Sequence, residues 1–148
     1  MVRYEKIIVA TDGTEYAKKA INAAVDLAEL TGASLYGIFV SDVSNITPTS
    51  VEWEMVAENI KRESDAALEY VRERAKAAQI NYESVSLSGA AAQEIVQYAN
   101  QISADLIVVG ATGKKAFERL IIGSVSEKVL RNAKQPVLVV RSDNPDTK

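Results

Sequence analysis

The sequence contains no cysteine and no histidine among its 148 residues. The absence of cysteine excludes disulfides and thiolate metal sites, and the absence of histidine excludes imidazole acid–base chemistry and nucleophiles activated by histidine. Together, these two absences exclude most familiar hydrolase mechanisms. A chain without cysteine is also compatible with a reducing compartment.

Long apolar runs and a marked excess of one charge are missing as well. No run approaches the roughly 20 residues that a membrane span needs, and the short apolar run 7–10 is too brief for the h-region of a signal peptide. The 17 basic and 20 acidic residues give a net charge of −3, which argues against general binding to nucleic acid or to anionic membranes. We therefore expect a soluble cytoplasmic protein in which any anion site is local.

The pattern of apolar residues predicts five strands alternating with four helices. The predicted strands are 6–10, 34–40, 82–87, 105–109 and 136–140, and the predicted helices are 14–31, 51–78, 92–102 and 125–133. Thr14 is expected to cap the first helix. This alternation is typical of an α/β domain with a parallel sheet, right-handed crossovers and helices on both faces. Ligands of such sheets bind beyond the carboxyl ends of the strands, where the strand order reverses.

Two segments that follow predicted strands could bind a ligand. One is the turn 11–13 after the first strand, and the other is the loop 110–124, which leads from the fourth strand into the last helix. Glycine lets a ligand approach the backbone amides, and a helix N-terminus attracts anions, so phosphate is the natural ligand for this loop. The loop matches neither the Walker A motif nor G-x-G-x-x-G. It reads G-x2-G-x9-G-S, formed by Gly110, Gly113, Gly123 and Ser124.

This spacing resembles the ATP-binding branch of the universal stress protein family, whose pattern is G-x2-G-x9-G-[ST]. Segments 7–14, 105–110 and 136–141 also resemble the family's first, fourth and fifth strands. The resemblance implies a Rossmann-like, HUP-type open sheet of five parallel strands in the order 3-2-1-4-5. It implies one domain over residues 1–141, followed by a polar tail, 142–148. It also implies a homodimer through antiparallel pairing of strand 136–141.

The resemblance further implies a set of nucleotide contacts. Thr11, Asp12 and the backbone near Val40 would hold adenine, and Gly110 would border the ribose. The phosphates of ATP, ADP or AMP would be held by Gly113, Gly123, Ser124, Val125 and Ser126, with Mg²⁺ or Mn²⁺ accompanying them. Independently of the resemblance, Lys114 lies in a stretch of net positive charge that suits a triphosphate. Residues 111 and 112 depart from the larger or more basic residues that the family often has there.

Two of these residues could instead have purely local structural roles. Ser124 and Glu127 have the spacing of a capping box, and Asp12 can simply stabilise a tight turn. No residue stands out as a catalytic base or dedicated metal ligand, so binding is better supported than hydrolysis. The predicted function is a nucleotide-dependent switch or sensor in the stress response, with a possible protein partner. The alternatives are a slow ATPase or a phosphate- or adenylate-transferring enzyme of the same fold, and a protein-interaction module without nucleotide.

Overall fold

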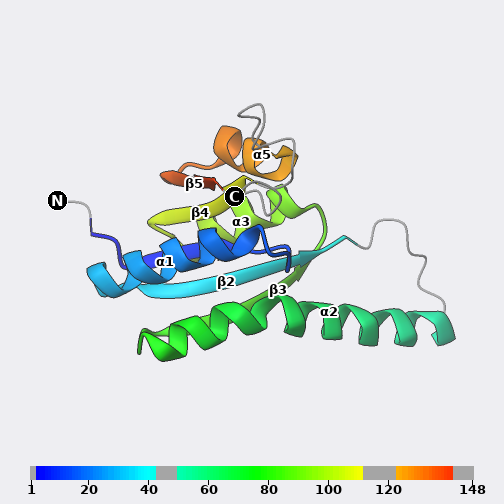
Figure 1. The fold of residues 1–148 in the computed structure, drawn as a ribbon. Helices are drawn as coiled ribbons and strands as arrows, with labels where there is room; N and C mark the ends of the chain where they lie inside the picture. The colour runs from blue at the N-terminus through cyan, green and yellow to red at the C-terminus, as the bar shows by residue number, and fades with distance from the viewer. Residues whose placement is uncertain (1–2, 43–49, 112–122, 142–148) are drawn as a thin grey trace, which may run out of the picture.

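The structure is a computed structural model that describes residues 3–42, 50–111 and 123–141. Its centre is a parallel five-stranded sheet in the order β3-β2-β1-β4-β5 (Figure 1). The strands are β1 (Lys6–Ala10), β2 (Ser34–Ser41), β3 (Tyr82–Ser88), β4 (Leu106–Ala111) and β5 (Val137–Arg141). The predicted fold class and strand order are confirmed.

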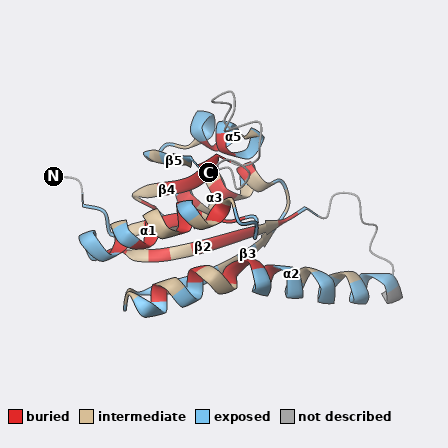
Figure 2. Ribbon diagram, viewed as in Figure 1, coloured by how far each residue is buried: buried red, intermediate tan, exposed pale blue. Residues whose placement is uncertain are grey.

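Helices cover both faces of the sheet. They are α1 (Ala17–Thr31), α2 (Ser50–Ala77), α3 (Ala91–Ile102) and α5 (Ser124–Asn132). Helices α1 and α2 pack on one face, and α3 and α5 pack on the other, so that two apolar clusters sandwich the strands. Figure 2 shows the buried residues on the strands and on the helix sides that face them. None of the described helices is long and apolar enough to cross a membrane.

The two central strands are buried because both of their faces are covered. Ile7, Ile8 and Val9 of β1 have no exposed surface, and neither do Ile107 and Val108 of β4. This explains why both strands read as continuous apolar runs rather than as alternating patterns. The edge strand β3 differs, because half-buried and exposed residues alternate in it from Val85 to Ser88.

The strand order reverses between β1 and β4. From β1 the chain passes through α1 to β2 on one side, whereas β4 pairs with the other side of β1, with Val9 opposite Val108. The carboxyl ends of β1 and β4 are therefore neighbours. The turn after β1 and the glycine at position 110 near the end of β4 consequently lie at the same edge of the sheet.

The first helix begins later than the sequence predicts. It starts at Ala17 without a side-chain cap, and Thr14 does not cap it. Instead, the Thr14 backbone N–H and hydroxyl both donate to Asp12 Oδ1, at 2.9 and 2.6 Å. Asp12 therefore stabilises a tight turn over these residues, and α1 begins about one helical turn later in the sequence than predicted.

Candidate functional site

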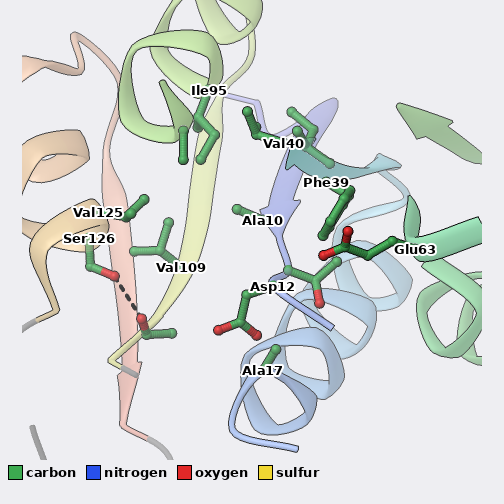
Figure 3. Close-up of a pocket in the computed structure, with 14 residues that line it drawn as sticks. Ala10, Asp12, Ala17, Phe39, Val40, Glu63, Ile95, Val109, Val125 and Ser126 are labelled. Carbon is green, nitrogen blue, oxygen red and sulfur yellow. Dashed lines mark hydrogen bonds between the residues drawn. The ribbon is translucent and has the colours of Figure 1, made fainter. Parts of the chain in front are cut away.

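A cavity of about 280 Å³ lies at the carboxyl edge of the sheet, at the reversal between β1 and β4 (Figure 3). This is the edge at which open parallel sheets bind their ligands. The cavity is lined by Ala10, Thr11, Asp12, Ala17, Ile38, Phe39, Val40, Glu63, Ala91, Ile95, Val109, Gly110, Val125 and Ser126. These residues come from three strand ends, from the first turns of α1, α3 and α5, and from the middle of α2.

The structure brings six of the ten predicted site residues together around this cavity. They are Thr11, Asp12, Val40, Gly110, Val125 and Ser126. Gly123 and Ser124 immediately precede Val125 at the start of α5. Gly113 and Lys114 lie outside the described residues.

The turn 11–13 is held by its own side chains. The hydroxyl of Thr11, which is buried, accepts a hydrogen bond from the Gly13 N–H at 3.1 Å. Gly13 has a φ of +81°, and a Cβ at this position would lie 3.1 Å from the Cβ of Ala67 on α2. This glycine is therefore required by the backbone conformation and by the close approach of α2.

Asp12 serves the turn and also faces the cavity. Its Oδ1 accepts both hydrogen bonds from Thr14, as the turn interpretation predicts. Figure 3 shows its carboxylate pointing into the space between the ends of β1 and β4. The turn fixes the direction of the side chain, so the carboxylate is positioned before any ligand arrives.

The packing of the described residues does not require a glycine at position 110. A Cβ at this position would lie 3.6 Å from Ala20 Cβ and 3.8 Å from the Tyr16 carbonyl oxygen, which are ordinary contacts, and its φ is not in the left-handed region. The fold therefore has room for a side chain where the sequence has none. A bare backbone at the wall of a cavity permits the close approach of a ligand.

The N-terminus of α5 presents amides that no side chain caps among the residues that the structure describes. The N-cap residue is Gly123, with φ −58° and ψ 158°, and the first backbone bond of the helix runs from the Glu127 N–H to the Gly123 carbonyl at 2.9 Å. The amides of residues 124–126 precede this bond and have no acceptor within the helix. Such a terminus attracts an anion through these amides and through the helix dipole.

The capping box that the spacing of Ser124 and Glu127 allows as an alternative role does not form. The helix begins one residue earlier than that motif requires, so Ser124 is its first residue rather than its cap, and the Ser124 side chain is exposed. The Glu127 carboxylate instead pairs with Arg131 one turn further on, at 2.8 Å. The hydroxyl of Ser124 is thus not used for capping.

Ser126 has a structural role that the sequence did not indicate. Its side chain is buried, and its hydroxyl donates to the Gly110 carbonyl oxygen at 2.7 Å (Figure 3). This bond joins the first turn of α5 to the end of β4. It sets the position of the exposed amides relative to Gly110.

Glu63 is a cavity residue that the sequence did not indicate either. It lies on α2, whose charged residues are typical of a solvated helix face, and no motif surrounds it. Asp12 and Glu63 are the charged residues among those that line the cavity. Over the described ranges, no group of three or more acidic side chains is arranged to hold a metal ion.

Comparisons with known proteins agree on one family. The sequence model of the Universal stress protein family matches residues 3–141. A relative from Methanocaldococcus jannaschii, the universal stress protein MJ0531, is 40% identical over 140 residues, which cover 93% of this chain and 82% of the relative.

Solved structures show the same fold. The hypothetical protein MJ0577 superposes with a TM-score of 0.84 at 25% identity, over 97% of this chain and 99% of its own. A universal stress protein crystallised in complex with cAMP superposes with a TM-score of 0.68 at 26% identity, over 96% of this chain and 100% of its own.

Proposed function

The chain belongs to the universal stress protein family, and we propose that it is an ATP-binding member that acts as a nucleotide-dependent switch or sensor in the stress response. The cavity at the carboxyl edge of the sheet is the proposed binding site. A cytoplasmic location is part of the same proposal.

The observation that carries this proposal is that Gly110 lies next to the start of α5. Gly110 leaves room beside the cavity that the described residues do not fill. The amides of residues 124–126, which no described side chain caps, lie next to it. A sugar phosphate uses both features, because the sugar needs close approach to the backbone and the phosphate needs unpaired amides. The relative crystallised with cAMP supports an adenine nucleotide as the ligand.

Each part of the nucleotide has a proposed set of contacts. Adenine lies against the Thr11–Asp12 turn and the backbone at Val40, and the ribose borders Gly110. The phosphates lie at the start of α5, on Gly123, Ser124, Val125 and Ser126, with Gly113 and Lys114 completing the set.

A divalent cation accompanies the phosphates in this proposal. Mg²⁺ keeps several waters and takes oxygen ligands from the phosphates themselves, with one or two protein groups at most. A dedicated cluster of acidic residues is not needed for a cation that arrives with the nucleotide.

The other part of the proposal is a homodimer formed through segment 136–141. β5 is at the edge of the sheet, and Leu138 is 37% exposed there. An apolar edge strand has unpaired backbone groups that favour pairing with a second strand.

Mass spectrometry of the denatured protein tests the proposed ligand. We expect an adenine nucleotide to be released from freshly purified protein, and we expect Mg-ATP to raise the melting temperature of nucleotide-free protein, because a ligand that binds only the folded state stabilises it. Absence of both effects would reject nucleotide binding. If a nucleotide is bound, single-turnover assays with excess protein distinguish a switch, which retains ATP, from an ATPase, which releases ADP.

A further inference from the structure

Glu63 is a charged residue in the cavity to which the proposed contacts assign no role. Its carboxylate reaches from α2 into the cavity beside Phe39 (Figure 3). Within the described part of the chain, this carboxylate forms no ion pair. A carboxylate without an ion pair, such as that of Glu63, repels phosphate and favours groups that donate hydrogen bonds.

The order of residues along the cavity places Glu63 relative to a nucleotide. Figure 3 shows Ser126 and Val125 at one end, Glu63 and Phe39 at the other, and Asp12 between them. A nucleotide is likewise ordered as phosphate, sugar and base. With the phosphates at the start of α5 and the ribose at Gly110, the base lies against the Asp12 turn and Val40 and reaches Glu63.

We infer that Glu63 is a specificity-determining residue that accepts a hydrogen bond from the exocyclic 6-amino group of adenine. This inference depends on the proposed nucleotide binding. Adenine has a donor at this position, whereas guanine and hypoxanthine have an oxygen acceptor there, which a carboxylate repels. A hydrogen bond to a charged acceptor contributes more than one between neutral groups.

Removing either partner of this hydrogen bond gives a direct test. ATP is compared with purine riboside triphosphate, which lacks only the 6-amino group, by calorimetric titration of the wild type, Glu63→Ala and Glu58→Ala. Glu58 is also an exposed glutamate of α2 but does not line the cavity, so its variant is a matched control.

The wild type is expected to prefer ATP by about tenfold or more, which is the effect of one hydrogen bond to a charged group. Glu63→Ala is expected to bind both ligands equally, and Glu58→Ala should keep the preference. Glu63→Gln, which retains a neutral acceptor, is expected to keep part of it.

Three results would overturn the inference. The first is an unchanged tenfold preference for ATP in Glu63→Ala. The second is tighter binding of GTP than of ATP by the wild type. The third is a loss of affinity in Glu63→Ala that is as large for purine riboside triphosphate as for ATP. Failure of the wild type to bind either ligand would instead reject the proposed function itself, which distinguishes the two failures.

Discussion

At the scale of single residues, two positions near the cavity are occupied by glycine for different physical reasons. Gly13 is required by its φ of +81° and by Ala67, whereas Gly110 has an ordinary conformation and ordinary space around it. The first glycine serves the fold. The second serves a ligand in our account, so the two positions should respond to substitution in opposite ways.

The variant Gly110→Ala should fold normally and bind ATP weakly. An added methyl group makes only ordinary contacts with Ala20 and Tyr16, so the melting temperature without ligand should hardly change. The methyl occupies space that the ribose needs, and we expect about a tenfold loss of ATP affinity, which corresponds to roughly 1.4 kcal/mol. Gly13→Ala is the opposite case and should lower the free energy of unfolding by more than about 1 kcal/mol. Unchanged ATP binding by a folded Gly110→Ala would remove the role of this glycine.

Ser126 and Ser124 form a second pair for comparison. Ser126→Ala removes the buried hydrogen bond to the Gly110 carbonyl and should lower the free energy of unfolding by about 1 kcal/mol. Ser124→Ala changes an exposed side chain and should stay within about 0.5 kcal/mol. Urea denaturation measures both values. Equal effects of the two substitutions would show that the Ser126 bond does not hold α5 to β4.

At the scale of elements, the sequence predicts the strands well because they are buried apolar runs bounded by turn residues. The prediction covers β1 over its full range, and it displaces β4 and β5 by one or two residues each. The starts of α2, α3 and α5 were predicted to within one residue. The start of α1 was missed by three residues, because Thr14 bonds to Asp12 in the preceding turn and does not cap the helix. Glu63 could not be predicted, since its place in the cavity depends on how α2 packs across β2.

The start of α5 provides a prediction about this element. The φ of −58° at Gly123 is available to every residue, so Gly123→Val should fold, with a loss of about 1 kcal/mol for a poorer N-cap. The branched side chain lies in front of the amides and should exclude phosphate. We expect at least about a tenfold loss of affinity for ATP, or roughly 1.4 kcal/mol, and little change for adenosine, which has no phosphate. Equal losses for both ligands would place the phosphates elsewhere.

At the scale of the whole molecule, the site and the proposed dimer use different parts of the same sheet. The cavity lies where the central strands β1 and β4 end, and β5 forms an edge. A dimer formed through β5 would therefore use none of the residues that line the cavity. This separation allows the two proposals to be tested independently.

Proline at position 139 tests the dimer. The Ile107 N–H donates to the Pro136 carbonyl, and the alternation of a parallel ladder then turns the Val139 N–H away from β4, toward the open edge. Val139→Pro should remove this outward donor and convert a dimer into a monomer of 16.0 kDa, because proline is tolerated at edges but cannot donate. Val139→Ala keeps the donor and should remain dimeric. Light scattering after gel filtration measures both masses, and a dimeric, folded Val139→Pro would exclude pairing through this strand.

The central claim is that an adenine nucleotide binds in the cavity at the reversal between β1 and β4. Titration of isotope-labelled protein with Mg-ATP, followed through the backbone amide resonances, tests it most directly. Our account predicts saturable shifts at residues 11–13, at Val40, at Gly110 and at residues 123–126, with one nucleotide bound per chain. Absence of saturable shifts, or shifts confined to residues remote from this cavity, would contradict it.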